Sequence, residues 1–388
     1  MKILMVLDHD FPPDIRVENE IETLTRVGHE VHIACFTMKN KALKDNFEGA
    51  TIHRKVISKL RHKTSVGCLK LPFYFNFWRG FLIDLQHTYN FDAIHIHDLP
   101  MAQLGYEMKK KFEVRFILDL HENWPALLAQ ADHVKGLLGK MLSNNNQWKH
   151  YEKFMCLQAD EIIVVVEEAK NRLVKSNIPA QKISVVSNTL NTAHFKVPDS
   201  KPDKDYLTLF YAGGINRHRG LQTIIPALAL LPNKVRLYIL GDGSFVDELQ
   251  SIARQNNVVD QVKFFGWQAF EKMNQLMGEA DICLIPHVKS DHTDNTIPHK
   301  LFQYMYAKKP VVASNCDPIQ RIIEESASGM IYQWEDSEEF SKIIEKLLKS
   351  PEQLITMGEN GYQATVKNYL WKNDAARLVK LYATNDKR

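Results

Sequence analysis

Short apolar runs alternate with amphipathic stretches from the start of the chain. The run at residues 3–7 has the length of a buried parallel strand, and the next stretch begins a helix near Arg16 with apolar residues on one side. Gly28 ends that helix, and a second apolar run follows at residues 31–36. A strand, a helix and a strand within about 35 residues predict a parallel, doubly wound sheet.

The alternation stops once and then begins again. Residues 191–205 contain two prolines, several basic residues and no apolar run, which is typical of a linker. Strand-like runs at 207–212, 235–240 and 281–286 then alternate with helix-like segments. We therefore expect an α/β fold with two Rossmann-like domains, the first at residues 1–190.

The length and composition of the chain are typical of a soluble protein with two domains, and its cysteines indicate the cytoplasm. A chain of 388 residues exceeds one ordinary core, and 45% hydrophobic with 24% charged residues is typical of a soluble globular protein. The net charge of +3 gives no sign of a nucleic-acid partner. The five cysteines lack metal or redox spacing, the first apolar run is too short for a signal peptide, and no segment approaches the roughly 20 apolar residues of a membrane-spanning helix. We expect a cytoplasmic protein with reduced thiols.

Two predicted strands end in a histidine followed by an acid. Residues 91–98 end in His97-Asp98, and residues 115–122 end in His121-Glu122. The carboxyl ends of parallel strands are where α/β proteins collect their chemistry. One such pair often only caps a strand, but two at equivalent positions favour a cleft.

Two segments resemble phosphate sites. Gly213-Gly214 lie between a predicted strand and a helix, with Arg217 and Arg219 in the same loop. Glycines there let backbone N–H groups approach a phosphate, although an ordinary turn also favours glycine. A second helix start, at residues 294–300, has cap-type residues and free N–H groups that suit an anion. Two anion-ready loops together favour phosphate binding.

Residues 54–83 combine basic and aromatic side chains. No acid lies between residues 51 and 70, and an aromatic stretch follows, which suits an anionic membrane face. The alternative is a solvated basic loop followed by a buried helix, in which Phe73, Phe77 and Phe81 would face the core.

Two interpretations of Arg16 are also open. Its side chain could contact a phosphate, or it could be a solvated residue at the start of a helix.

The ordered set of motifs resembles the retaining GT-B-fold glycosyltransferases of family 4. The matching segments, in the family's order and spacing, are FPPDIRVENEIETLTRVGHEV, HIHDLP, LDLHENWP, YAGG, LGDG, FFGW, PHKLFQYM and KKPVVAS. The resemblance is nearest to members that build bacterial surface polysaccharides. It implies two Rossmann-like domains facing each other across a cleft, a nucleotide-sugar domain at 206–365, and a helix at 366–388 that packs back on the first domain.

The resemblance also implies roles for individual residues. Arg219 corresponds to the family's basic residue on the diphosphate, and His121 to the histidine near the reacting sugar. The implied donor-binding set is Gly213, Gly214, Arg217, Gly241, Phe265, Gly266, Trp267, Asn295, Thr296, Ile297, Lys300 and Gln303. The implied catalytic set is His121, Arg219 and Glu122, and the acceptor side would be lined by Arg16, His97 and Asp98.

Three positions depart from the family's pattern. Gly214 replaces an arginine that members often have, and Arg217 or Lys300 would compensate. Asn295 and Gln303 stand where the family has two glutamates, the first on the donor sugar and the second on the ribose. A charged hydrogen bond contributes about 1.5–3 kcal/mol and a neutral one about 0.5–1.5 kcal/mol. The amides therefore predict a weaker or altered donor preference, or loss of activity.

The implied reaction is transfer of a sugar from a nucleotide diphosphate, with UDP-sugars favoured, to a glycan or lipid-linked acceptor. The resemblance implies retention of configuration and no metal or other cofactor. No nucleic-acid partner is expected, and residues 54–83 would attach the protein peripherally to the inner face of a membrane. Two alternatives stay open: a nucleotide-sugar epimerase of the same fold, and a non-catalytic nucleotide-sugar binder, which the two amides favour.

Overall fold

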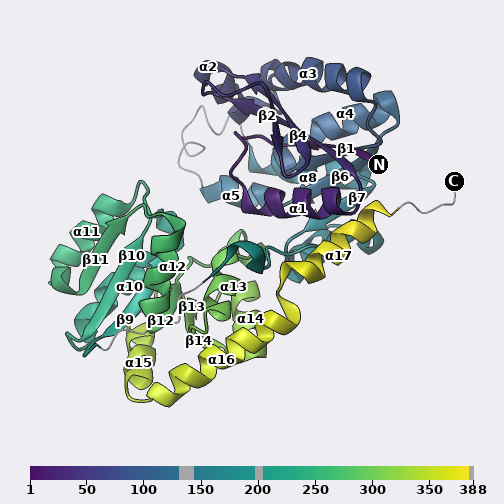
Figure 1. Cartoon of the computed structure of the whole chain (residues 1–388). Coiled ribbons are helices and arrows are strands. Elements are labelled where there is room, and N and C mark those ends of the chain that lie inside the picture. Colours follow the sequence, from purple (N-terminus) through teal and green to yellow (C-terminus); the bar gives the residue numbers. More distant parts are fainter. Residues whose placement is uncertain (131–143, 197–203, 384–388) are drawn as a thin grey trace. The chain divides into compact units, whose positions relative to one another are not determined.

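The computed structural model describes residues 1–130, 144–196 and 204–383 (Figure 1). The chain forms two compact units, of which the first comprises Met1–Ser187 with Asp374–Arg388 and the second Asn188–Asn373. The predicted linker begins inside the second unit, because Leu190 pairs with Leu370 and Phe195 packs on Phe270. Residues 197–203 of that linker lie outside the described residues.

The first unit is built on an eight-stranded sheet in the order β3-β4-β2-β1-β5-β6-β7-β8. Its strands are β1 (Lys2–Val6), β2 (Glu30–Thr37), β3 (Lys44–Phe47), β4 (Ala50–Val56), β5 (Ala93–His97), β6 (Arg115–Leu120), β7 (Glu161–Val164) and β8 (Ile183–Val185). Neighbouring strands pair parallel, except β3 with β4. The central strand β1 is apolar and almost wholly buried because helices cover both faces of the sheet.

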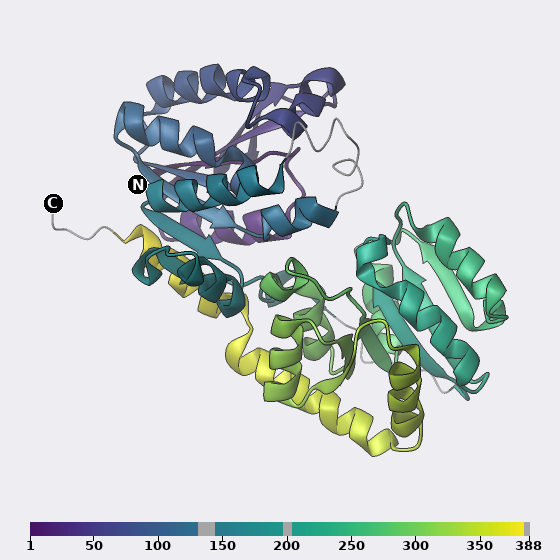
Figure 2. The same cartoon turned by 180° about the vertical axis from the view of Figure 1, so that it is seen from behind.

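Helices connect the strands of this sheet and pack on it. They are α1 (Ile15–Arg26), α2 (Lys59–Lys63), α3 (Phe73–Tyr89), α4 (Ala102–Phe112), α5 (Trp124–Gln130), α8 (Asn145–Gln158), α9 (Glu167–Lys175) and most of α17 (Trp371–Tyr382). Figure 2 shows α3, α4 and α8 side by side as one layer. Helix α1 starts where it does because the carboxylate of Asp14 accepts hydrogen bonds from the N–H groups of Arg16 and Val17.

The predicted stripe of phenylalanines on α3 is wrong. Phe77 is buried, but Phe73 is 58% exposed and Phe81 only half-buried. The helix instead buries Tyr74 and Trp78 beside Phe77, so its core face is turned by one residue from the predicted one.

The second unit contains a six-stranded, all-parallel sheet in the order β11-β10-β9-β12-β13-β14. Its strands are β9 (Leu207–Ala212), β10 (Val235–Leu240), β11 (Val262–Gly266), β12 (Ile282–Ile285), β13 (Val311–Ser314) and β14 (Gly329–Tyr332). Its helices are α10 (Leu221–Ala227), α11 (Val246–Gln255), α12 (Phe270–Glu279), α13 (His299–Tyr306), α14 (Asp317–Ser326), α15 (Ser337–Leu348) and α16 (Pro351–Asn368). Apolar side chains of β9, β10, β12, β13 and β14 pack with those of α10, α11 and α15 in one core.

The start of α13 differs from the sequence expectation. Of the predicted cap residues, Asp294 and Asn295 lie in a separate 3-10 turn (Thr293–Asn295) and Thr296 follows it, whereas α13 begins at His299 with Pro298 at its N-cap. No side chain caps the helix, so the prediction of capping is wrong. The first N–H groups of α13 are therefore not satisfied by a cap.

No helix within the described ranges is both long and apolar enough to cross a membrane. The five cysteines are free and buried, as expected for reduced thiols.

Candidate functional site

In each sheet, one edge collects loops from strands on either side of a reversal in strand order. In the first sheet β1 lies between β2 and β5, and such reversals are where doubly wound sheets bind ligands. Asp8 lies just after β1, His97 ends β5 with Asp98 next to it, and His121 follows β6. The two histidine–acid pairs predicted from the sequence thus lie at the same edge.

The imidazole of His121 lies between two carboxylates. Its Nε2 is 3.2 Å from Oδ2 of Asp119, and its Nδ1 is 3.6 Å from Oδ2 of Asp98. Asp98 also accepts a hydrogen bond from the backbone N–H of His121 at 3.3 Å. Burial opposes the charged ring, but the two carboxylates raise the pKa of His121 to about 9. His121 is therefore an imidazolium at neutral pH. Glu122, beside it, is half-buried at the same strand end.

His97 does not line a ligand surface as predicted. The residue is only 2% exposed, and its Nδ1 lies 3.2 Å from Nε2 of His121. Burial and the neighbouring His95 hold the pKa of His97 well below its ordinary value, so the ring is neutral. His97 therefore contacts the ring of His121 inside the protein, and it is too buried to contact an acceptor.

Arg16 is part of the core rather than a phosphate ligand. Its guanidinium donates two hydrogen bonds to Oδ2 of Asp119, at 2.8 and 3.2 Å, and one to Oδ1 at 3.0 Å. A further N–H donates to the carbonyl of Val186 at 2.9 Å. Both sequence-based alternatives for Arg16 are therefore wrong, because its partners come from strands far along the chain.

A buried group of titratable side chains surrounds this ion pair. Glu20 lies 3.2 Å from Nε of Arg16, His95 lies 3.6 Å from Asp119, and Tyr382 of α17 is 2.7 Å from Nδ1 of His95. Burial and the nearby Asp119 raise the pKa of Glu20 to about 8, whereas Arg16 holds the pKa of Asp119 well below its usual range. The two carboxyls thus share one negative charge at neutral pH.

We expect Glu20→Gln to remove a loss of stability at higher pH. The folded pKa of Glu20, about 8, lies above the unfolded value of 4.5, so its stabilising contribution is complete below pH 4.5 and falls as pH rises towards 8. Glutamine imitates the protonated acid and does not titrate. Relative to the wild type, the variant should gain about 2–3 kcal/mol of unfolding free energy between pH 5.5 and 7.5, measured with urea. Glu22→Gln, on the solvent side of the same helix, is the control; an equal gain there would contradict this account.

Asp8 is a site residue that the sequence reasoning did not select. The Tyr74 hydroxyl donates a hydrogen bond to it, and burial raises the pKa of Asp8 to about 7. A carboxyl with a pKa near neutrality, at the same edge as His121, can hold or release a proton there. Its signal in the sequence was present, since Asp8 directly follows the first apolar run.

The second sheet has its reversal at β9, which lies between β10 and β12. Gly220, with φ of 77°, lets the loop after β9 touch the end of β12, since a Cβ there would lie 1.5 Å from the Pro286 carbonyl oxygen. A Cβ on Gly241 would lie 2.0 Å from the Gly213 carbonyl oxygen. The loops after β9, β10 and β12 are therefore packed backbone against backbone.

This packing changes the predicted role of two glycines. The N–H of Gly213 donates to the Leu240 carbonyl at 3.0 Å, and the N–H of Gly241 donates to the Gly266 carbonyl at 2.8 Å. Neither N–H is left to hold a phosphate, so that part of the prediction for Gly213 is wrong. The glycines shape the loops that present other groups.

Two basic side chains, Arg219 and Lys300, lie at this edge. Nη1 of Arg219 donates to Nε2 of His287 at 3.2 Å, and its buried Nε has no hydrogen-bond partner among the described residues. Nζ of Lys300 lies 4.0 Å from the centre of the Tyr211 ring. Burial and the charge of Arg219 hold the pKa of Lys300 well below its ordinary value. An anion between them would satisfy the Nε of Arg219 and favour the charged form of Lys300.

The positions that depart from the family differ in their surroundings. A Cβ on Gly214 would meet only the Asn216 side chain at 3.5 Å, an ordinary contact. The Asn295 amide already donates to the carbonyl of Asp291 at 2.7 Å. Gln303 is half-buried in α13.

The remaining donor-side candidates lie on three loops. Trp267 is 77% exposed after β11, and the Phe265 ring before it packs on Tyr238 at 5.2 Å between ring centres. Gly266 has φ of 66° with open space around it. The other members are Arg217, whose guanidinium lies 5.6 Å from the Phe245 ring centre, the half-buried Thr296 and the buried Ile297.

Within the described ranges, one cluster has the spacing of metal ligands. Its ligand atoms lie within 4.8 Å of one another, in Glu20, His95, His97 and Asp119. The guanidinium of Arg16 already supplies the positive charge there, so a metal ion would face a cation at close range. Asp8 and Asp10 form an Asp-x-Asp triplet, but Tyr74 and Lys41 are their partners. We therefore assign no metal to either group.

Two family models match the chain along nearly its whole length. The one described as Glycosyltransferase Family 4 matches residues 15–194, and the one described as Glycosyl transferases group 1 matches residues 194–364. The chain belongs to the GT-B glycosyltransferases of family 4. This confirms the resemblance drawn from the motifs and makes the protein a transferase of sugars.

Solved structures agree on the fold of this glycosyltransferase. A sucrose-phosphate synthase from Thermosynechococcus elongatus has a TM-score of 0.80 at 17% identity, with 98% of each chain covered. The Anabaena protein HepE, solved in complex with UDP, has a TM-score of 0.74 at 14% identity, covering 99% of this chain and 100% of its own. These likenesses confirm the predicted α/β fold class with two Rossmann-like parallel sheets.

Curated relatives are distant, and they cover between about half and nearly all of the chain. An uncharacterised glycosyltransferase of Methanocaldococcus jannaschii is 21% identical over 410 residues, which cover 98% of each chain. An amylovoran biosynthesis glycosyltransferase of Erwinia amylovora is 25% identical over 182 residues, 46% of this chain and 45% of its own.

Proposed function

We propose that this glycosyltransferase moves a sugar from a nucleotide diphosphate to a glycan or lipid-linked acceptor with retention of configuration. The pair of Arg219 and Lys300 carries the donor assignment, because a diphosphate would supply the hydrogen-bond acceptor that Nε of Arg219 lacks. We favour UDP-sugars, since the related HepE was solved with UDP and with UDP-glucose. Relatives named for amylovoran and lipopolysaccharide biosynthesis support a role in bacterial surface polysaccharides.

Charge explains how the donor side would promote the reaction. Breaking the sugar–phosphate bond places negative charge on the departing diphosphate. Arg219, Lys300 and the uncapped start of α13 would stabilise that charge. These groups would supply positive charge where a divalent cation could otherwise act, so we propose catalysis without a metal. The exposed ring of Trp267 would cover the base.

The edge of the first sheet would provide the acceptor side. The imidazolium of His121 can donate a hydrogen bond to an oxygen of the reacting sugar, and Asp98 and Asp119 hold it in the charged form. Asp8, with a pKa of about 7, would take the proton of an attacking hydroxyl. Glu122, at the same edge, stays a candidate catalytic residue.

A non-catalytic binder is the second candidate. The observation in its favour is that the Asn295 amide is engaged with Asp291, where the family has a glutamate for the donor sugar. An epimerase is less favoured than either. It would need carboxylates around the sugar, whereas Asn295 and Gln303 have amide side chains. Turnover of a bound nucleotide-sugar separates these possibilities.

Nucleotide diphosphates test the donor assignment directly. Because a ligand that binds only the folded state stabilises it by RT ln(1 + [L]/Kd), UDP at about 100 times Kd should add about 2.7 kcal/mol and raise the melting temperature. ADP and GDP at the same concentration are the controls for base preference. If no nucleoside diphosphate shifts the melting temperature, the donor assignment is wrong.

We expect Gln303→Glu to tighten donor binding. A carboxylate at this position would replace a neutral hydrogen bond to the ribose with a charged one, a difference of about 1 kcal/mol or roughly fivefold in Kd for UDP. Gln353→Glu, in the first turn of α16, is the matched control and should leave Kd unchanged. Calorimetric titration measures both, and a weaker affinity in Gln303→Glu would place the ribose elsewhere.

We also propose peripheral attachment to an anionic membrane, with a corrected set of residues. Arg54 is buried against Asp45, and Lys55 donates to the Phe77 carbonyl, so neither belongs to the surface. The exposed basic residues of this segment are Lys59, Arg61, Lys63 and Lys70. The 79% exposed Leu60 lies among them, which suits a charged lipid surface.

Sedimentation with phosphatidylglycerol vesicles tests this attachment. The protein should sediment at low salt and be released at high salt, because screening weakens charge attraction at the surface. Lys59→Glu combined with Arg61→Glu should reduce sedimentation, and Lys342→Glu in the second unit should not. No sedimentation at low salt would exclude attachment by this surface.

A further inference from the structure

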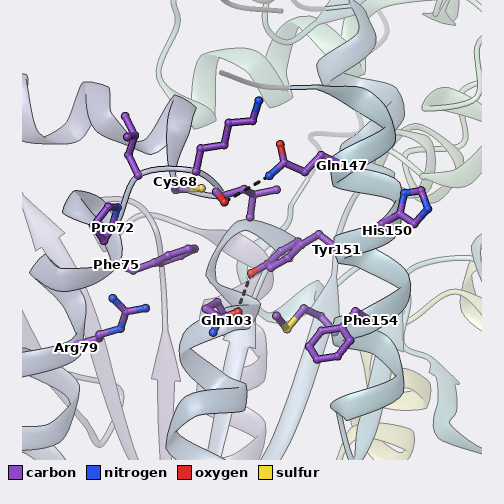
Figure 3. Close-up of a pocket in the computed structure, with 13 residues that line it drawn as sticks. Cys68, Pro72, Phe75, Arg79, Gln103, Gln147, His150, Tyr151 and Phe154 are labelled. Carbon is purple, nitrogen blue, oxygen red and sulfur yellow. Dashed lines mark hydrogen bonds between the residues drawn. The ribbon is translucent and has the colours of Figure 1, made fainter. Parts of the chain in front are cut away.

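A cavity of about 520 Å³ opens in the first unit among α3, α4 and α8, and Figure 3 shows its lining. Its volume lies in the range of roughly 300–1,000 Å³ that is typical of small-molecule sites. Phe75 of α3 and Tyr151 of α8 lie on facing walls in this view. Most of the surface is apolar and comes from Leu69, Leu71, Pro72, Phe75, Phe154 and Met155.

The polar atoms of the wall are already engaged within the protein. The Tyr151 hydroxyl accepts from the N–H of Gln103 at 2.7 Å and donates to the carbonyl of Pro100 at 3.4 Å. The Gln147 side chain donates to the Leu69 carbonyl at 3.4 Å. A sugar or a nucleotide would therefore find few hydrogen-bond partners inside. A hydrocarbon chain needs none and gains from leaving water.

The lining of the cavity contains basic residues. Among the described residues that line it none is acidic, and the basic ones are Lys70, Arg79 and His150. Arg79 forms two hydrogen bonds of 2.7 Å with Glu107, so its charge is offset. Lys70 and His150 also line the cavity, and both side chains are exposed. This arrangement complements an anionic head attached to an apolar chain.

The cavity continues into the exposed surface that surrounds it. Leu71, at the rim, is 38% exposed, and the neighbouring Phe73 is 58% exposed. Helix α2, with Lys59 and Leu60 exposed, precedes this rim in the chain. Leu71 and Phe73 therefore extend apolar surface from the cavity to the outside of the protein.

We propose that this cavity holds the hydrocarbon chain of an anionic lipid whose phosphate lies beside Lys70. The lipid would be either an isoprenyl phosphate that carries the acceptor or a phospholipid of the membrane, since both join an apolar chain to a phosphate. The inference rests on the proposed function only where it gives the lipid the role of acceptor carrier. Binding itself requires no nucleotide-sugar, so it can be tested alone.

Calorimetric titration of farnesyl phosphate into the full chain, without nucleotide-sugar, tests the proposal. The wild type should bind, and Leu71→Asp should weaken binding about tenfold or more because it puts a carboxylate in the apolar wall near the phosphate. Leu43→Asp introduces the same charge at an exposed leucine of the same unit that does not line the cavity, and should leave Kd within about twofold. Equal effects of the two variants, or no binding by the wild type, would overturn the proposal.

Two further titrations test whether Lys70 contacts the phosphate and which class of lipid the cavity binds. Lys70→Glu should weaken farnesyl phosphate about tenfold but leave the uncharged farnesol within about twofold; equal losses for both would remove the phosphate from Lys70. Tighter binding of farnesyl phosphate than of oleoyl lysophosphatidic acid supports an isoprenyl carrier, and the reverse order supports a membrane phospholipid. Melting curves of Leu71→Asp and Lys70→Glu that match the wild type show that a loss of binding is not a loss of folding.

Discussion

Arg219→Ala should abolish donor use while the protein stays folded. Arg219 carries a buried Nε without a partner among the described residues and stands beside Lys300, so it is the group best placed to meet the diphosphate. Losing one such donor to a developing negative charge typically costs about 100- to 1,000-fold in rate. We expect a loss of that size in kcat/KM for a UDP-sugar, measured by release of UDP.

The stability of the same variant provides an internal check. Removing one of two neighbouring cations relieves repulsion, so the melting temperature without ligand should not fall, whereas the increase caused by UDP should disappear. Arg254→Ala, an exposed arginine on α11, is the matched control and should behave like the wild type. Unchanged kinetics in Arg219→Ala would remove this residue from the site.

Arg16→Ala should produce the largest loss of stability, because it leaves Asp119 buried without its main partner. Arg16 is only 3% exposed, and its guanidinium makes three hydrogen bonds to that carboxylate. Breaking a buried ion pair by removing one member costs about 3–5 kcal/mol, a large part of a total stability of roughly 5–15 kcal/mol. Urea unfolding at neutral pH, followed by circular dichroism, measures the loss.

Arg26→Ala is the matched control on the same helix. Arg26 pairs with Glu22 at the surface, where its side chain is 71% exposed, and such pairs contribute at most about 0.5 kcal/mol. If Arg16→Ala unfolds at the same urea concentration as Arg26→Ala, the buried network does not stabilise the first unit as described.

The alternation of strands and helices was predictable because covered parallel strands are apolar on both faces. The run at residues 3–7 and the run at 207–212 needed no tertiary information to be recognised as strands. The histidine–acid pairs were likewise found from strand ends alone. Asp8 was available by the same reasoning, but the environment that raises its pKa to about 7 comes from burial and is invisible in the sequence.

Partners distant in the chain were not predictable. Arg16 and Asp119 are 103 positions apart, and Tyr382 and His95 are 287 positions apart, so local patterns carry no trace of their contact. Arg16 therefore looked like a surface residue at a helix start. The prediction that Arg54 belongs to a basic surface was wrong for the same reason, since the residues that bury it lie on other elements.

The donor loops illustrate a subtler limit. The glycine pattern indicated backbone N–H groups for a phosphate, and glycine was indeed required, but by close packing between loops. The N–H of Gly213 donates a hydrogen bond to the carbonyl of Leu240 at the end of β10, and only the three-dimensional structure shows this contact. The basic side chains of Arg219 and Lys300 thus carry more of the donor site than the motif suggested.

Transfer by the purified chain is the most direct test of the central claim. The chain should release UDP from a UDP-sugar in the presence of a lipid-linked glycan acceptor, with the sugar appearing on the acceptor in the donor's anomeric configuration by NMR. The rate should persist in the presence of EDTA. Binding of nucleotide-sugars without release of any nucleoside diphosphate, across donors and acceptors, would contradict the claim and identify the chain as a binder.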